Sequence, residues 1–117
     1  MLGVWAIISG MSGVQQYVKI GAHTFVGGYT RVHMDVPAYV IAQGNPSEPR
    51  SINAEGLKRR DFSSEDISVL MKAFKTLYKR KLSLQDALIQ LAELSETHPV
   101  VRPFYESVSD PDRRFIR

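Results

Sequence analysis

The sequence predicts a parallel β-helix of about two coils followed by a C-terminal helical domain. The first observation is a strict period of six, in which an aliphatic residue is followed four positions later by a small or β-branched one. Helices repeat near 3.6 and ordinary strands repeat every 2, whereas in a hexapeptide β-helix each hexad forms one face of a triangular coil. The second observation is a helical period beyond Arg50. The hexad columns are Leu2, Ile8, Val14, Ile20, Val26 and Val32, followed by Ala6, Ser12, Val18, Thr24, Thr30 and Val36.

The hexad segment is expected over residues 1–44, with its aliphatic column pointing into the prism. The turn formers Gly44, Pro46 and Pro49 then break the period. Two coils bury little, and solenoids need at least about three repeats with a cap at each end. We therefore expect that residues 1–44 belong to a longer β-helix or that partner chains complete them.

The helical domain is expected over residues 50–117. One amphipathic helix carries Ile67, Leu70, Met71, Phe74, Leu77 and Tyr78, and Ser63 or Ser64 precedes it. A second helix follows Ser83, and a third, shorter one begins around Pro103. The tail DPDRRFIR shows no period.

The composition excludes several classes of function. The chain has 117 residues, a net charge of +3 and no cysteine, so disulfides and thiolate chemistry are absent. No apolar run approaches the ~20 residues of a membrane-spanning helix, and the start MLGVWAIISG lacks the basic region of a signal peptide. Scattered histidines predict no metal site, and no aromatic-interleaved basic face predicts nucleic-acid binding. We expect a cytoplasmic protein.

The blocks IGAH, VGG, DVPAYVIAQGN and N-x-EGLKRR together carry a specific resemblance over essentially the whole chain. The sequence resembles the acyl-carrier-protein-dependent UDP-N-acetylglucosamine O-acyltransferases that begin lipid A synthesis. The resemblance implies a homotrimer of left-handed β-helices, with active sites in grooves between subunits. It also implies transfer of a 3-hydroxyacyl group from acyl carrier protein to the 3-hydroxyl of UDP-N-acetylglucosamine, without a further cofactor. The family's general base and oxyanion glycine lie upstream of Leu2, so we assign no catalytic residue.

The segment around Asn53 is the best candidate for a nucleotide site. Asn53 can cap the short helix AEGLKRR, and Glu55 and Arg59 are four residues apart, so they can pair or converge on a ligand. A guanidinium suits a diphosphate because it makes forked hydrogen bonds to phosphate oxygens, and Arg60 follows directly. The alternative is a capped helix with one surface ion pair. The resemblance implies that Asn53, Glu55 and Arg59 bind the uridine diphosphate.

Four further residues are candidates through the resemblance. Gln15 and Gln16 align with a His-Gln pair that contacts substrate near the acceptor sugar; the alternative is that they are two solvated wall residues. His23 belongs to the IGAH block and is expected to have a structural or groove-lining role, not that of the base. Gly28 is expected to leave the acyl-chain groove open, unless Gly27 and Gly28 simply form a tight corner.

The sequence leaves two alternative functions open. One is a non-catalytic trimerising or UDP-sugar-binding module, and the other is a different hexapeptide-repeat acyltransferase, against which the EGLKRR block argues. The helical segment also carries a basic run that suits an acidic acyl carrier protein or is merely a solvated face. This run comprises Lys72, Lys75, Lys79, Arg80 and Lys81.

Overall fold

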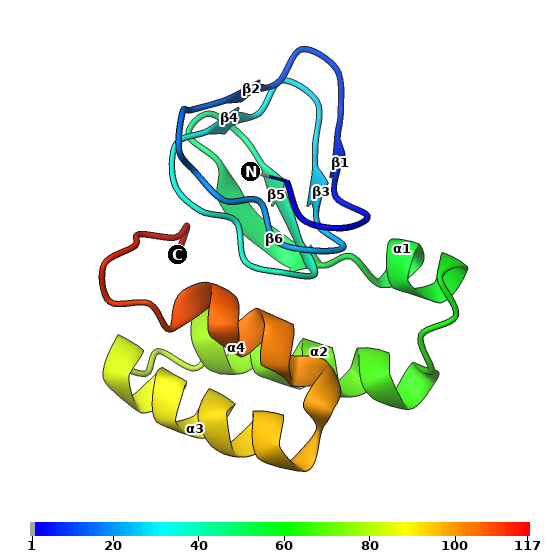
Figure 1. Ribbon diagram of the computed structural model, residues 1–117, viewed down its shortest axis with the longest axis vertical. Helices are drawn as coiled ribbons and strands as arrows, with labels where there is room; N and C mark the ends of the chain where they lie inside the picture. Colours follow the sequence, from blue (N-terminus) through cyan, green and yellow to red (C-terminus); the bar gives the residue numbers. More distant parts are fainter. Residues whose placement is uncertain (1) are drawn as a thin grey trace.

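The chain winds into stacked coils that lie on a layer of helices (Figure 1). A computed structural model describes residues 2–117. Short strands pair in parallel with strands one coil later: β1 with β3, and β2 with β4. Each step is eighteen residues, or three hexads, as in Ile7 opposite Phe25. These strands are β1 Ile7–Ile8, β2 Gly13–Val14, β3 Phe25–Val26 and β4 Arg31–Val32.

The next step is two residues shorter than the hexad period predicts. Ile20 pairs with Val36, and Phe25 pairs with Ile41 in β5 (Val40–Gln43). Val36 was expected four residues after an aliphatic position, but its place opposite Ile20 puts it in the aliphatic column itself. The predicted position of Val36 in the hexad is therefore wrong, because the segment between Val32 and the next face of the coil is two residues shorter than the period predicts.

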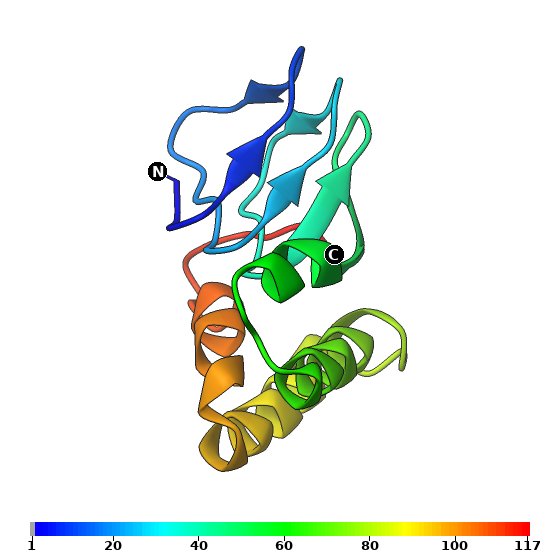
Figure 2. The ribbon, with the colours of Figure 1, turned by 90° about the vertical axis from the view of Figure 1, so that its right-hand side faces the viewer.

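The sheet continues past residue 44, where the hexad segment was expected to end. Strand β6 (Glu48–Ile52) pairs antiparallel with β5 and completes a sheet in the order β1-β3-β5-β6. The chain reverses through Gly44, at φ 112°, and a cis Asn45–Pro46 peptide bond. Figure 2 shows this longer hairpin beside the stacked short strands. The reversal delivers the chain to the helices at Ile52.

Two glycines permit the coils to approach closely at one corner. A Cβ on Gly3 would lie 2.5 Å from the Ala22 amide nitrogen, and one on Gly21 would lie 2.4 Å from the Ala38 nitrogen. Backbone atoms cannot move aside as flexible side chains can. These glycines therefore set the spacing between successive coils.

The predicted helices form, and their caps are as expected. The Ser63 and Ser83 hydroxyls accept hydrogen bonds from the Asp66 and Asp86 amides. Pro103 lies in the first turn of α4, where its missing N–H costs nothing. The helices are α1 Ala54–Arg59, α2 Ser64–Tyr78, α3 Leu84–Thr97, the 3₁₀ turn η1 Pro99–Val101 and α4 Arg102–Val108. Within residues 2–117, no helix has the length and apolarity needed to cross a membrane.

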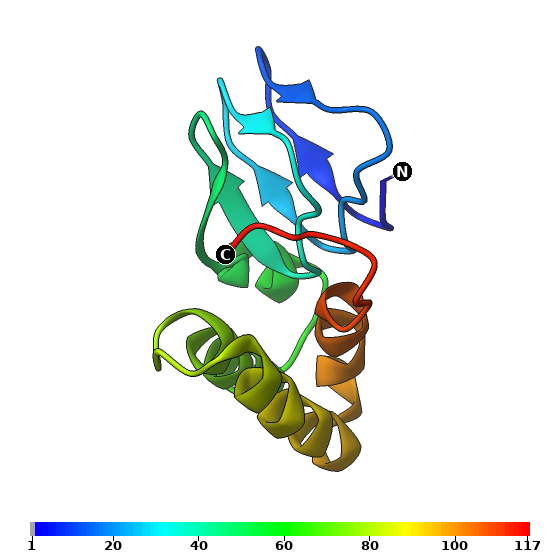
Figure 3. The same ribbon diagram turned by 90° about the vertical axis from the view of Figure 1, so that its left-hand side faces the viewer.

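The C-terminal tail, which has no period, runs back across the base of the coils (Figure 3). Asp35 forms a parallel bridge to Phe115, and the Ile116 side chain is buried. Arg113 donates a 2.9 Å hydrogen bond to the Asp35 carboxylate and a second bond to the Tyr17 carbonyl. The tail thus joins the coils to the helices, whose apolar residues share one continuous core.

Candidate functional site

One corner of the coil stack is built from Trp5, His23 and Tyr39. All three have left-handed backbones, with φ of 63°, 58° and 71°, and they follow the eighteen- and sixteen-residue steps of the coils. The His23 ring stacks on Tyr39, with 5.7 Å between centroids, and meets the Phe62 ring edge-on at 5.0 Å. Burial, assisted by the Asp66 carboxylate, raises the pKa of Tyr39 to about 12. The corner is therefore a rigid aromatic cluster with His23 at its centre.

Asn53 fixes helix α1 against this corner. Its side-chain oxygen accepts a 3.3 Å hydrogen bond from the Gly56 amide, which confirms the predicted cap. Its amide nitrogen donates a 3.0 Å bond to the His23 carbonyl, and its backbone N–H donates to the Tyr39 carbonyl. Because Asn53 is buried and both ends of its amide are used, it organises the site from beneath.

Arg60 connects the end of α1 to the corner. Its guanidinium lies 5.2 Å from the centroid of the Trp5 ring, and Nη1 lies 3.2 Å from His23 Nδ1. A guanidinium only donates, so this hydrogen bond requires an unprotonated Nδ1 and a proton on Nε2. Burial, together with the charge of Arg60, lowers the pKa of His23. The neutral imidazole and the guanidinium thus stabilise each other's orientation.

An open cleft of about 820 Å³ lies between this corner and the connection from α1 to α2. It is lined by Trp5, Ala6, Ile7, His23, Arg59, Arg60, Asp61 and Phe62. Two guanidinium groups and one carboxylate face it, which leaves an excess of positive charge. Such a cleft suits an anion with an apolar or aromatic group attached.

An ion pair between Glu55 and Arg59, one of the two arrangements that their spacing permits, does not form. Across residues 2–117 the ion pairs are Arg113–Asp35 and Arg50–Glu48, and both Glu55 and Arg59 are exposed. Arg59 lines the cleft, whereas Glu55 lies in the first turn of α1. Arg59 therefore remains free to bind a ligand.

Gln15 and Gln16 lie elsewhere in the chain. They line a separate cleft of about 450 Å³, together with Arg31, His33 and Arg113. No lining residue is shared with the Arg59 cleft. A single chain therefore does not bring these glutamines to the other candidate residues.

Gly28 stands in open space. A Cβ there would meet only the Gly10 carbonyl oxygen, at an ordinary 3.6 Å, and the Gly28 backbone is outside the left-handed region. Neither backbone strain nor crowding demands glycine at this position, unlike at Gly21. His23 and Gly28 lie at opposite ends of the coil face that carries β3.

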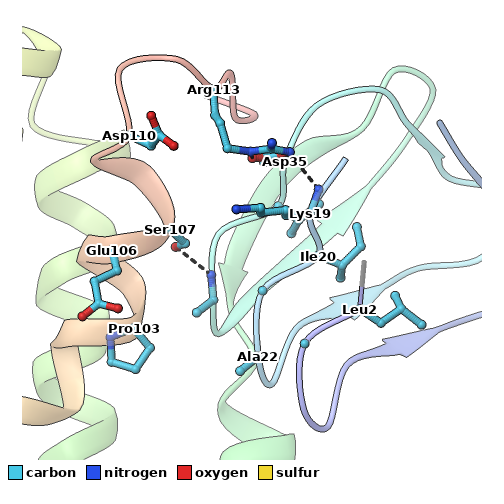
Figure 4. A pocket seen from close by; sticks show the side chains of 14 residues that line it. Leu2, Lys19, Ile20, Ala22, Asp35, Pro103, Glu106, Ser107, Asp110 and Arg113 are labelled. Atoms are coloured by element: carbon cyan, nitrogen blue, oxygen red, sulfur yellow. Dashed lines mark hydrogen bonds and ion pairs between the residues drawn. The ribbon is translucent and has the colours of Figure 1, made fainter. Parts of the chain in front are cut away.

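A third cleft, of about 390 Å³, separates α4 from the second coil (Figure 4). Glu106 and Asp110 stand on the α4 side, Lys19 stands on the coil side, and Arg113 reaches from the tail to Asp35. The Ser107 hydroxyl accepts a hydrogen bond from the Ala38 amide and crosses between the two walls. None of the residues predicted as site residues lines this cleft.

Sequence reasoning missed Trp5, Tyr39 and Phe62. Trp5 and His23 each stand three residues after an aliphatic column residue, so the period of six could have predicted that they share a corner. Phe62 lies in a connection without a period, and nothing in the sequence indicated its contact with His23. No three His, Cys, Asp or Glu side chains of residues 2–117 are arranged to hold a metal ion.

Comparisons with known proteins agree with this architecture. A curated acyl-[acyl-carrier-protein]–UDP-N-acetylglucosamine O-acyltransferase of Burkholderia thailandensis is 47% identical over 99% of the chain. The chain spans about half the length of such curated relatives, 46% in this case. The solved UDP-N-acetylglucosamine O-acyltransferase of Moraxella catarrhalis matches with a TM-score of 0.92 and 34% identity, over 98% of this chain and 45% of that one.

A second solved structure gives the same result. The UDP-N-acetylglucosamine acyltransferase of Francisella novicida has a TM-score of 0.94 and 31% identity, over 99% of this chain and 43% of its own. The family described as UDP N-acetylglucosamine O-acyltransferase, domain 2, matches residues 35–116, which include α1, the cleft arginines and the tail. The chain belongs to this UDP-N-acetylglucosamine O-acyltransferase family.

Proposed function

We propose that the chain is part of an enzyme that moves a 3-hydroxyacyl group from acyl carrier protein to the 3-hydroxyl of UDP-N-acetylglucosamine, in lipid A synthesis. The observation that carries the proposal is the cleft with two guanidinium groups beside α1, in a chain of this family. The named relatives use an acyl carrier protein and UDP-N-acetylglucosamine. The chain corresponds to about half of such a relative, and its share of the work is substrate binding.

The nucleotide diphosphate binds in the Arg59 cleft. The exposed Arg59 guanidinium is free to make forked, charge-assisted bonds to phosphate oxygens. Asn53 holds α1 in place, and the exposed Glu55 is available to a ligand hydroxyl. Gln15 and Gln16 serve the acceptor sugar from the other cleft.

Two separate clefts support a site shared between chains. We propose that the coils form a left-handed β-helix and associate as a homotrimer, so that the Gln15 cleft of one chain faces the Arg59 cleft of its neighbour. The exposed corner side chains Tyr17 and Tyr29 supply apolar area for this contact. Association would also offset the small burial of a short coil stack.

No residue of this chain is assigned as the general base. His23 is a poor candidate because Nδ1 is bound by Arg60 and its pKa is lowered. A base must take a proton from the attacking hydroxyl, and a guanidinium beside the imidazole opposes the charge that would form. His23 thus lines the groove, and we place the enzyme in the cytoplasm without a further cofactor.

Gly28 sets the length of the acyl chain. Since a side chain fits there without strain, its absence is available to keep the groove open. Gly28→Met, in an enzyme rebuilt around this segment from a relative's remaining coils, should shift preference toward shorter 3-hydroxyacyl donors. Excluding two methylenes would cost more than about tenfold in specificity, at about 0.8 kcal/mol each. An unchanged donor-length profile would place the length limit elsewhere.

The exposed basic side chains of α2 and the loop after it are available to an acidic acyl carrier protein. Electrostatic steering of this kind weakens with ionic strength. The rebuilt enzyme should therefore lose more of its acyl-carrier-protein affinity in salt than of its UDP-N-acetylglucosamine affinity.

The direct test is binding of UDP-N-acetylglucosamine to the 117-residue chain by calorimetry. Arg59→Ala should weaken binding by about tenfold or more, because a hydrogen bond to a charged group contributes about 1.5–3 kcal/mol. Lys58→Ala is the matched control, since Lys58 is exposed on the same helix but does not line the cleft. Equal effects of the two variants would refute the assignment. Binding without acyl transfer by the rebuilt enzyme would favour a non-catalytic module.

A further inference from the structure

The two guanidinium groups of the Arg59 cleft differ in how they are held. The Arg59 side chain is exposed, and its guanidinium has no hydrogen bond or ion pair to any other residue within 2–117. Arg60 is half-buried, with the Trp5 ring 5.2 Å from its guanidinium carbon and His23 Nδ1 at 3.2 Å from Nη1. The Arg60 guanidinium is therefore held by protein contacts before any ligand binds, whereas the Arg59 guanidinium is not.

We propose that Trp5 and His23 are positioning residues that hold the Arg60 guanidinium at the cleft, where it receives the diphosphate of a nucleotide sugar together with Arg59. The inference rests on the proposed nucleotide site and extends it to two residues on the coils. Trp5 acts through Arg60 and need not touch the ligand. Arg60 is the ligand-binding group.

The geometry leaves Arg60 with donors to spare. A guanidinium has five N–H donors in a plane, and within residues 2–117 the only protein acceptor for the Arg60 guanidinium is His23 Nδ1. The Trp5 ring faces the guanidinium without using an N–H, because a cation–π contact is electrostatic. The remaining donors are available to phosphate oxygens. Fixing the group beforehand lowers the entropy that a ligand must remove on binding.

The hydrogen bond also ties Arg60 to the protonation state of His23. Protonated imidazole has no acceptor, so it would release Nη1 and repel the guanidinium. The groups around His23 are Tyr39 stacked on one side, Phe62 at its edge, and Arg59, Arg60 and Asp61 in the shared cleft. A bound diphosphate would hold the Arg60 guanidinium more firmly in place. The guanidinium in turn favours the neutral form of the His23 imidazole.

The backbone of Trp5 dictates which substitution tests this cleanly. Its φ of 63° is left-handed, a region that asparagine tolerates better than other residues with side chains. Trp5→Asn therefore removes the ring while keeping a residue suited to the backbone. Met11→Asn is the matched control. Met11 is an exposed residue at another corner of the same coil, its backbone is also left-handed at φ 60°, and it does not line the cleft.

The experiment combines an NMR titration of His23 with UDP binding in the intact 117-residue chain. Trp5→Asn should raise the His23 pKa toward its ordinary value and weaken UDP binding about two- to fivefold, the worth of an exposed cation–π contact. Arg60→Gln should raise the His23 pKa further and weaken binding about tenfold or more. Met11→Asn should leave both unchanged. Trp5→Phe, which keeps an aromatic ring, should give a His23 pKa and a UDP affinity between those of wild type and Trp5→Asn. It replaces Trp5→Asn in the experiment if that variant does not fold.

The two measurements separate the two ideas. If Trp5→Asn moves neither the His23 pKa nor UDP affinity relative to Met11→Asn, positioning by Trp5 is overturned. If the His23 pKa responds but wild-type chain binds no UDP, the nucleotide site fails while the Trp5–Arg60–His23 coupling stands. If the pKa responds and UDP affinity does not, Arg60 is held but does not bind the diphosphate, and the proposal is overturned.

Discussion

The first and second coils obey the same hexad rule but occupy different environments. In the second coil the aliphatic positions Ile20 and Val32 are 2% and 0% exposed, whereas Leu2 and Val14 in the first are 59% and 40% exposed. Each first-coil residue lies opposite its second-coil counterpart. The hexad pattern therefore determines which residues pair, and burial requires a layer on both sides. The second coil has the first above it and the hairpin, helices and tail below.

Crowding at the two spacing glycines should give the largest difference between the coils. Gly21→Ala places a Cβ against Ala38, whose amide is held by Ser107 of α4, with the first coil packed on the opposite side. We expect a loss of about 3 kcal/mol in the free energy of unfolding. Gly3→Ala makes a similar clash with Ala22, but the first coil can move outward, so we expect about 1 kcal/mol. Urea unfolding measures both, and equal losses would show that the first coil is as confined as the second.

A smaller difference is expected from the register pair Val14 and Val32. Val32→Ala removes two buried methyl groups and leaves a cavity, at a cost of about 2 kcal/mol. Val14→Ala removes groups that are already partly in water, and about 0.5 kcal/mol is expected. The difference in urea midpoint between the variants tests this. A loss on Val14→Ala as large as on Val32→Ala would indicate that another surface, such as a second chain, covers the first coil in solution.

The period of six could predict the coils and their register because it reflects repeated local geometry. It could not predict the two-residue shortening before Val36, since Val36 also fits the expected position four residues after Val32 and the sequence there shows no break in the period. The helices and their serine caps followed from local signals alone. The tail did not, because its contacts depend on Asp35, nearly eighty residues away in sequence, and no local pattern encodes such a partner.

The candidate site was predictable only where it is local in sequence. The Asn53 cap uses Gly56, three residues on, and it was expected and found. The spacing of Glu55 and Arg59 permitted either an ion pair or convergence on a ligand; exposed helix pairs contribute little, and the ion pair does not form. The contact of Arg60 with Trp5 and His23 joins three separate segments, so sequence spacing could not reveal it.

Hydrogen bonds between the coils should contribute less than packing. The Ser12 hydroxyl of the first coil donates to the Gly27 carbonyl at 2.7 Å and accepts from the Thr30 amide at 3.1 Å. Ser12→Ala leaves that amide without its partner and should cost about 1 kcal/mol. Ser9→Ala is the control, because the Ser9 hydroxyl makes no hydrogen bond to residues 2–117. If the two variants unfold at the same urea concentration, water replaces the Ser12 bonds fully.

The smallest effect is a dependence on pH that links the coils through Arg60. The pKa of His23 is lowered in the folded chain from 6.5, mainly by burial and then by Arg60. The unfolded chain therefore binds a proton first, so the stability due to the neutral imidazole is present above pH 6.5 and is lost as pH falls through the folded pKa. Urea unfolding between pH 7.5 and 5 should show a decline that is reduced in His23→Gln. Trp5→Asn on the first coil should also reduce it, because a released Arg60 no longer opposes protonation of His23 on the second. An identical pH profile in wild type and His23→Gln would mean that the corner histidine carries none of this dependence.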